Sequence, residues 1–262
     1  MFPRLAQFGM LTIPTQGACI ALGLMLALLL AARTARMLSL DADRVWNLSF
    51  LAAVSFILGG RVMLILTHWR DYAAYPSLLL VVSAHSPALL IGSTAVALAA
   101  CAISLWMHPL PLLRILDALA APLALGYGFA CIGAFAAGAE YGTPTTVPWA
   151  VRFHSGYASL WSGTPQNIPL HPVQLYQAAF ELLLCGFLLW LLKKDHSDGE
   201  IAGAWLFLGG VSRFVFEFYR GGRGTEFLDA TQIIALLMIA AGSILYLDRK
   251  RPTSAVNQTD AL

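Results

Sequence analysis

The stretch LTIPTQGACIALGLMLALLLAA, residues 11–32, decides the class of this protein. No Asp, Glu, Lys or Arg occurs between Arg4 and Arg33. A helix that crosses the hydrocarbon core of a bilayer needs about 20 apolar residues, so this run predicts a membrane-spanning helix. Because the run lacks a basic n-region and further apolar runs follow it, we interpret it as a span and not as a cleaved signal peptide.

The composition of the whole chain points to the same class. Of the 262 residues, 58% are hydrophobic and 11% are charged, and the mean hydropathy is +0.71. A soluble domain averages about 25% charged residues, and a water-exposed surface cannot be covered with less than half of that supply. These values exclude the soluble globular, disordered and collagenous classes and predict an all-α polytopic membrane protein. The net charge of +2 is too small to indicate a nucleic-acid partner.

The apolar runs also predict the number and direction of the spans. We expect about seven transmembrane helices, at residues 11–32, 48–67, 87–107, 117–137, 173–192, 201–219 and 231–247. If the N-terminus lies outside, the cytoplasmic connections hold more Lys and Arg residues than the outer ones. The positive-inside rule therefore favours an outer N-terminus and a cytoplasmic C-terminus.

The rest of the chain is organised around these spans. We expect one integral membrane domain over residues 1–247 and a polar cytoplasmic tail over 248–262. The segment 138–172 is rich in proline and glycine and carries two tryptophans, which predicts a structured outer loop or small head at the membrane interface. The apolar segment 76–86, which contains His85, is expected to re-enter the membrane.

Ionisable residues inside a predicted span are costly, and they are therefore the first candidates for a site. In VSRFVFEFYR, residues 211–220, Arg213 and Glu217 are four positions apart and Glu217 and Arg220 are three apart. A helix would place all three on one face. Such a stripe is either an ion-pair ladder that joins helices or an anion site, in which two guanidiniums bind a phosphate and Glu217 orients one of them.

A second polar stripe occurs in HPVQLYQAAFE, residues 171–181. Pro172 suits the first turn of a helix, and the polar side chains of His171, Gln174, Gln177 and Glu181 would then share one face. His171 is either a helix cap or part of a site that the other three extend.

Two isolated residues are further candidates. Arg61 follows Gly59 and Gly60 inside a predicted span, where it either contacts a partner or lipid headgroup or extends to the interface. His85 is the natural candidate for a base, because the unperturbed pKa of histidine is about 6.5.

The cysteines predict neither a disulfide framework nor a metal site. All four lie in apolar runs, without a CxxC pair or a His/Cys spacing that suits a metal. We expect them to be small buried hydrophobic residues. They are Cys19, Cys101, Cys131 and Cys185.

Taken together, several segments resemble those of the bacterial prolipoprotein diacylglyceryl transferase family. They follow one another in order from about residue 9 to residue 240, so the resemblance covers nearly the whole chain. The segments are GGRVMLIL at 59–66, His85, IGAFAAGAEYG at 132–142, TPTTVPWA at 143–150, HPVQLY at 171–176, RFVFEFYR at 213–220, and Gln232.

The resemblance implies a reaction in the bacterial inner membrane. Family members move the diacylglyceryl group of phosphatidylglycerol, a glycerophospholipid, to a cysteine thiol of a prolipoprotein, and glycerol phosphate leaves. No metal or organic cofactor is implied. By this resemblance His85 is a candidate base or phosphate partner, Arg213 and Arg220 stabilise the leaving group, and Glu217 orients them. The implied substrate-binding residues are Arg61, Glu140, Gly142, His171, Gln174, Tyr176 and Gln232.

The chain departs from the family pattern in the signature segment. Cys131 stands where the family has arginine, and Ala134 and Ala137 stand where it has asparagine. Ala139 replaces the glutamate, and Glu140 follows one position late, which moves it about 100° around a helix axis.

These departures leave several functions open. Arg61 or Arg152 could compensate for the missing guanidinium, and Cys131 could act as an unusual nucleophile. The alternatives to the family reaction are a paralogue that uses another headgroup or acceptor, and a non-catalytic lipid-binding protein. A small transporter is a third alternative, although the sequence shows no pair of matching halves.

Overall fold

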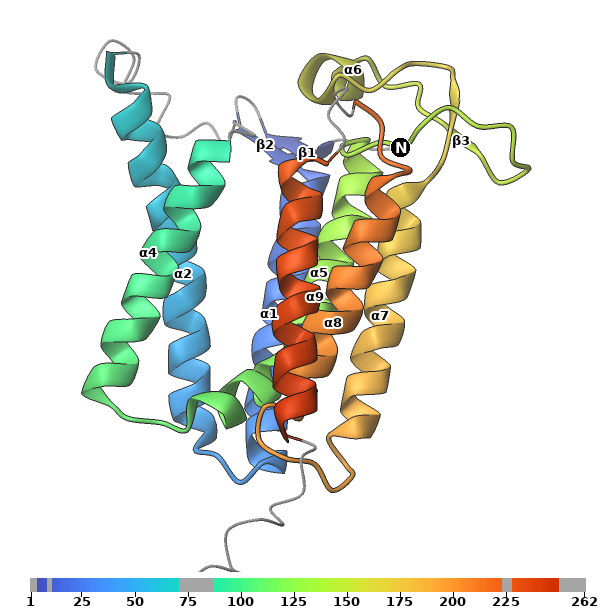
Figure 1. Cartoon of the computed structure of the whole chain (residues 1–262). Helices are drawn as coiled ribbons and strands as arrows, with labels where there is room; N and C mark the ends of the chain where they lie inside the picture. Colours follow the sequence, from blue (N-terminus) through green and yellow to red (C-terminus); the bar gives the residue numbers. More distant parts are fainter. Residues whose placement is uncertain (1–3, 9–10, 71–86, 223–227, 250–262) are drawn as a thin grey trace, which may run out of the picture. The chain divides into compact units, whose positions relative to one another are not determined.

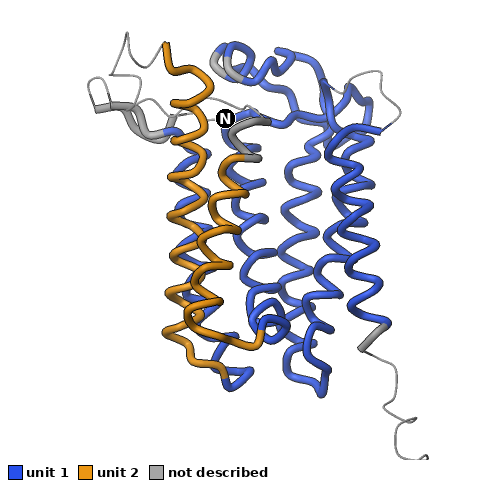
Figure 2. Tube along the Cα trace, turned by 60° about the vertical axis from the view of Figure 1, so that its left-hand side comes forward, with its two compact units in different colours: residues 1–39, 112–262 blue, residues 40–111 orange. Residues whose placement is uncertain are grey.

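The structure is a computed structural model that describes residues 4–8, 11–70, 87–222 and 228–249. It is mainly helical and divides into two compact units, residues 1–39 with 112–262 and residues 40–111 (Figure 2). The expected re-entrant segment 76–86, its His85 and most of the tail 248–262 lie outside the described residues.

Unit 1 contains five long helices and the connections at their ends (Figure 1). The helices are α1 Thr15–Met37, α5 Leu112–Ala137, α7 Val173–Leu191, α8 Glu200–Glu217 and α9 Ala230–Arg249. Helix α5 packs against α1, α7 and α8, and α8 packs against α9. Helix α5 therefore lies at the centre of the unit, and its inward-facing side chains form a large part of the interior of the unit.

Unit 2 is a helical pair, α2 Ala42–Thr67 and α4 Pro87–Met107. The two helices approach each other closely at Gly59, where an added Cβ would lie 2.7 Å from the Cβ of Val96. Small residues at such a crossing let the backbones of membrane helices pack tightly.

The expected number of about seven spans is not confirmed. Among the residues that the structure describes, five helices are long and apolar enough to cross a membrane: α1, α2, α5, α7 and α9. Helix α4 contributes a shorter apolar stretch, Gly92–Met107. Helix α8 includes Glu200, Arg213 and Glu217 within its 18 residues, so its composition is less apolar than that of a simple lipid-facing span.

The helix boundaries lie within about two turns of the predicted ones. The largest difference in kind is at the first span, where residues 11–14 are not helical. They form strand β2 Leu11–Pro14, which pairs with β1 Arg4–Phe8 in an antiparallel hairpin. Proline disfavours helical geometry in the residue that precedes it, so the helix begins only after Pro14.

One hydrogen bond shows how α5 accommodates a proline at its centre. Pro122 has no N–H, and its ring position removes the usual helical partner of the Ala118 carbonyl. The hydroxyl of Thr34, from α1, donates to that carbonyl at 2.6 Å. Because a buried carbonyl without a partner is expensive in a membrane, this bond stabilises the α1–α5 contact.

Helix α8 begins against α5 in a similar way. Its N-cap is Gly199, which has no side chain to accept the first N–H groups of the helix. The buried carboxylate of Asp117 accepts from the backbone N–H of Gly199 at 2.6 Å and of Ala202 at 2.7 Å. A negative charge at a helix N-terminus is favourable, so Asp117 fixes the start of α8 on α5.

The connection between α5 and α7, residues 138–172, is an ordered substructure. It holds strands β3 Val151–Arg152 and β4 Pro169–Leu170, which pair antiparallel, and the short helix α6 Gly156–Ser162. Phe153 is 1% exposed and packs edge to face on Phe135 of α5. The side of the membrane on which this substructure lies stays a prediction, as does the orientation of the termini.

Candidate functional site

Arg213 lies near the middle of a group of polar residues between α5, α7 and α8. Its Nη1 donates a hydrogen bond to the hydroxyl of Tyr127, from α5. The guanidinium carbon also lies 5.5 Å from the centre of the Tyr127 ring. Within the described part of the chain, Arg213 forms no salt bridge with a carboxylate. Its positive charge is therefore not neutralised by direct contact.

Cys131 lies one turn beyond Tyr127 on the same helix. Its side chain is 4% exposed. Ala134, a further turn along α5, is 2% exposed. The positions where the signature segment lacks its arginine and one asparagine are thus filled by small neutral side chains in the interior.

Three buried polar side chains connect α7 with α8 next to Arg213. The amide Nε2 of Gln177 donates to Glu181 Oε1 at 3.0 Å and to Ser212 Oγ at 3.1 Å. Each of the three is less than 5% exposed. The stripe predicted from residues 171–181 is therefore helical and faces inward at these positions, and Gln177 joins it to the residue that precedes Arg213.

Arg220 has a different environment. The helix ends at Glu217, so Arg220 lies in the turn beyond it and not on a continuous helical face as the spacing predicts. Its Nε donates to Glu217 at 2.9 Å and its Nη1 donates to Glu140 at 2.8 Å. Burial lowers the pKa of Arg220, but the carboxylates of Glu140 and Glu217 raise it more, so its pKa is above the ordinary value.

Gly142 brings three segments together at this end of the unit. It forms a β-bridge with Arg220, and the N–H of Thr143 donates to the carbonyl of Tyr219 at 2.8 Å. A Cβ at position 142 would lie 2.2 Å from the carbonyl oxygen of His171. Only glycine fits here, because any side chain would separate these segments.

His171 belongs to a small aromatic group. Its ring packs edge to face on Tyr219 at 5.4 Å, and its Nδ1 lies 3.3 Å from the hydroxyl of Tyr176. The same hydroxyl accepts a bond of 2.6 Å from the indole N–H of Trp149. The arrangement joins the connection 138–172, the start of α7 and the end of α8.

Gln174 has a buried acceptor that the protein does not use. Its Nε2 donates to the carbonyl of Ala139 at 2.6 Å, which fixes the orientation of the amide. The residue is 3% exposed, and its Oε1 has no hydrogen-bond donor among the described residues. A buried amide oxygen without a donor is unfavourable and is suited to a ligand or water that donates to it.

The other predicted site residues are placed as follows. Gln232 is fully buried and forms a capping box at the start of α9: its N–H donates to Asp229 at 2.8 Å, and its Oε1 accepts from the Asp229 N–H at 3.4 Å. Arg152 is exposed on β3. Arg61 is half-buried in unit 2.

Unit 1 thus contains eleven of the thirteen predicted site residues, all except Arg61, which lies in unit 2, and His85, which lies outside the described residues. Two members of the polar group were not predicted as site residues, Tyr127 and Ser212. Their only signal in the sequence is a hydroxyl inside an apolar run, which is common in membrane helices.

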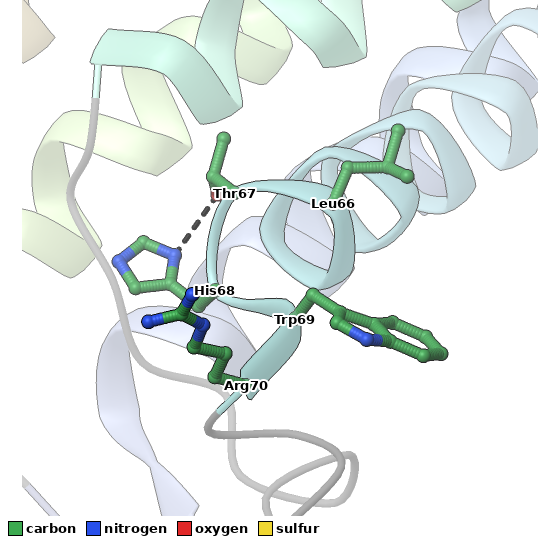
Figure 3. Close-up of a pocket in the computed structure, with 5 residues that line it drawn as sticks. All are labelled: Leu66, Thr67, His68, Trp69 and Arg70. Atoms are coloured by element: carbon green, nitrogen blue, oxygen red, sulfur yellow. Dashed lines mark hydrogen bonds between the residues drawn. The ribbon is translucent and has the colours of Figure 1, made fainter.

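A shallow hollow occurs elsewhere, at the end of α2 (Figure 3). It is lined by the consecutive residues 66–70, and the only hydrogen bond drawn there joins Thr67 to His68. None of these residues belongs to the predicted site. Among the residues that the structure describes, no group of three His, Cys, Asp or Glu side chains could hold a metal ion.

Comparison with known proteins identifies what the chain is similar to. A family model described as prolipoprotein diacylglyceryl transferase matches residues 3–247. A phosphatidylglycerol–prolipoprotein diacylglyceryl transferase of Clostridium tetani is 32% identical over 96% of this chain and 99% of its own length. A second such transferase, from Clostridium perfringens, is 30% identical over 90% of this chain and 91% of its own length. A third, from Pseudoalteromonas translucida, is 31% identical over 76% of this chain and 74% of its own length.

Proposed function

Because the chain belongs to the prolipoprotein diacylglyceryl transferase family, we propose that it transfers a diacylglyceryl group from phosphatidylglycerol to a prolipoprotein cysteine. The sulfur of the acceptor thiol bonds to the terminal glycerol carbon of the diacylglyceryl group. The bond from that carbon to the phosphate oxygen breaks, and the oxygen keeps the electron pair. The thiol loses its proton to a base, and glycerol phosphate leaves.

The observation that carries the proposal is the environment of Arg213. The leaving phosphate gains negative charge as the carbon–oxygen bond breaks, so a cation placed beside it stabilises the transition state more than the substrate. Arg213 supplies such a cation, because its described polar partner is a neutral hydroxyl. Its remaining N–H groups suit the two oxygens of a phosphate.

Arg220 receives a supporting role. Both of its described hydrogen-bonding nitrogens are used by Glu140 and Glu217, and the group of three carries a formal charge of −1 when both carboxylates are ionised. Such a group attracts an anion poorly. We therefore assign the phosphate contact to Arg213. Arg220 is assigned a structural role, in which its bonds to Glu217 and Glu140 stabilise the turn after α8.

The headgroup glycerol is assigned to the region around Gln174, His171 and Tyr176. Phosphatidylglycerol offers hydroxyl donors, and the Oε1 of Gln174 is a buried acceptor without a donor among the described residues. Gly142 keeps the segments on either side close enough to enclose this region. His85 remains the proposed base, and Arg61 and Arg152 remain proposed lipid contacts.

The location follows from the apolar helices. In the described part of the chain, five of them are long and apolar enough to cross a bilayer, which agrees with an integral membrane enzyme that takes its donor from the lipid phase. We propose the bacterial inner membrane, with the N-terminus and the connection 138–172 on the outer side and the C-terminus in the cytoplasm.

The test is a transfer reaction in detergent with phosphatidylglycerol and a peptide that carries the acceptor cysteine. We expect the peptide to gain the mass of a diacylglyceryl group, and glycerol phosphate to be released in equal amount. A peptide with serine in place of the cysteine is the control and should stay unmodified. If neither product forms from phosphatidylglycerol, the proposed function is wrong.

A further inference from the structure

We propose that Tyr127 is a positioning residue that holds the guanidinium of Arg213 toward the departing phosphate. This inference rests on the proposed function and adds a residue to it. Neither the motifs in the sequence nor the comparisons single out Tyr127.

Tyr127 contacts Arg213 in two different ways. Its hydroxyl accepts a hydrogen bond from Nη1, and the guanidinium carbon lies 5.5 Å from the centre of its ring. The hydrogen bond fixes one nitrogen, and the nearby ring limits where the guanidinium carbon can lie. An arginine side chain has several rotatable bonds, so two contacts from one rigid ring restrict it strongly.

The chemistry of the partner matters as much as its position. A carboxylate in the same place would neutralise Arg213 and reduce its attraction for a phosphate, as Glu140 and Glu217 do for Arg220. A tyrosine hydroxyl is neutral, so it orients the guanidinium and leaves its charge available. Tyr127 therefore supplies orientation without charge compensation.

The support beneath Tyr127 is rigid. Helix α5 is in contact with α1, α7 and α8, and its neighbouring residues Ala124, Gly128 and Cys131 are buried. Next to Tyr127, a Cβ added to Gly128 would lie 3.2 Å from the side chain of Leu182 on α7. A residue on such a helix can hold Arg213 in one place, which a residue on a mobile loop could not do as well.

The experiment compares Tyr127→Phe, Tyr127→Leu and Arg213→Ala in the transfer assay. Tyr127→Phe keeps the ring and removes the hydroxyl, and we expect kcat to fall about tenfold, the value of one hydrogen bond that acts in the transition state. Tyr127→Leu removes both contacts and should lower kcat about 100-fold, because small misplacements of a catalytic group cost that much. KM for phosphatidylglycerol should change less than about twofold in Tyr127→Phe.

The matched control is Ser243→Ala, which removes a hydroxyl that bonds to a carbonyl of its own helix α9. It should leave kcat unchanged. Thermal unfolding in detergent is measured for every variant, since a merely structural role for Tyr127 would lower the unfolding temperature and leave the kcat of the folded protein intact.

A second readout does not depend on activity. Phenylglyoxal modifies arginine, and the rate at which the Arg213 peptide gains its mass reports how firmly the guanidinium is held. We expect this rate to rise at least about threefold in Tyr127→Phe, because the variant loses the hydrogen bond that fixes Nη1. The rate in Ser243→Ala should equal that of the unaltered protein.

The outcomes separate the inference from the function beneath it. If Arg213→Ala abolishes transfer while Tyr127→Phe and Tyr127→Leu keep full kcat, the inference is wrong and the function stands. If the unaltered protein transfers nothing, the function is wrong, and the phenylglyoxal rate alone decides whether Tyr127 holds Arg213. An unchanged rate in Tyr127→Phe refutes the inference in either case, and should Tyr127→Leu fail to fold, Tyr127→Phe carries both measurements.

Discussion

Arg213 and Arg220 belong to the same short segment and yet differ in their direct hydrogen-bond partners. Arg213 is within α8 and contacts the neutral hydroxyl of Tyr127. Arg220 is in the turn after α8 and contacts two carboxylates, those of Glu140 and Glu217. The guanidinium of Arg213 has no carboxylate in direct contact among the described residues, so it is available to an anionic ligand. The guanidinium of Arg220 uses two of its nitrogens to bind carboxylates of the protein itself.

The difference shows that spacing alone does not make two arginines into one anion site. A cation contributes to phosphate binding only in so far as its own carboxylate partners leave it uncompensated. An ion-pair ladder and an anion site, which the sequence left as alternatives, are each favoured at one of the two arginines. The predictions below test this division, beginning with the largest effect.

The largest effect is expected for Arg213→Ala. If Arg213 stabilises the leaving phosphate, its loss should lower kcat for diacylglyceryl transfer by about 10²–10³, the usual cost of removing a group that acts on developing charge. Arg213→Lys should recover part of the activity, since it keeps the charge without the planar fork. Full activity in Arg213→Ala would show that the two arginines do not differ as described.

The second effect concerns stability. In Arg220→Ala, Glu217, whose side chain is 6% exposed, loses its partner in a poorly solvated place. Removing one member of a buried pair costs about 3 kcal/mol in free energy of unfolding. Denaturation in mixed detergent measures this change, and kcat per folded molecule should fall less than about tenfold, well below the loss in Arg213→Ala. A variant of unchanged stability that has lost transfer by 10² or more would instead make Arg220 a phosphate contact.

The smallest effect is expected for Glu140→Gln. The Glu140 side chain is 47% exposed, and pairs exposed to this extent contribute less than about 1 kcal/mol. The variant keeps a similar shape and an acceptor for Arg220, so its unfolding free energy and its kcat should both stay close to those of the unaltered protein. A loss of stability as large as that of Arg220→Ala would mean that Glu140, and not Glu217, is the main partner of Arg220.

The sequence predicted some of this site because the relevant signals are local. The spacing HPVQLYQAAFE placed Gln174, Gln177 and Glu181 on one face of a helix, and α7 does turn all three inward. The same reasoning was less successful at the end of α8, where it extended the helix to Arg220. The helix stops at Glu217 because the following residues pair with the segment around Gly142, which is distant in the sequence.

Two further features differ in how far the sequence indicates them. Gln232 was predicted as a substrate-binding residue, and the structure places its backbone and amide in the cap of α9. Tyr127 is one aromatic residue in an apolar run, and nothing near it in the sequence indicates a contact with Arg213. The contact between Tyr127 and Arg213 depends on which helices lie next to each other, whereas the cap formed by Asp229 and Gln232 is local.

The sequence by itself determined that this is a helical membrane protein, where its apolar helices run and which family it belongs to. These are properties of contiguous segments, because the cost of placing a polar backbone or a charge in lipid is decided residue by residue along a span. Only the tertiary structure decided which arginine is neutralised and which is held by a neutral partner. A charge is compensated by whatever lies within a few ångströms of it, and α5, α7 and α8 bring those groups together from segments far apart in the chain.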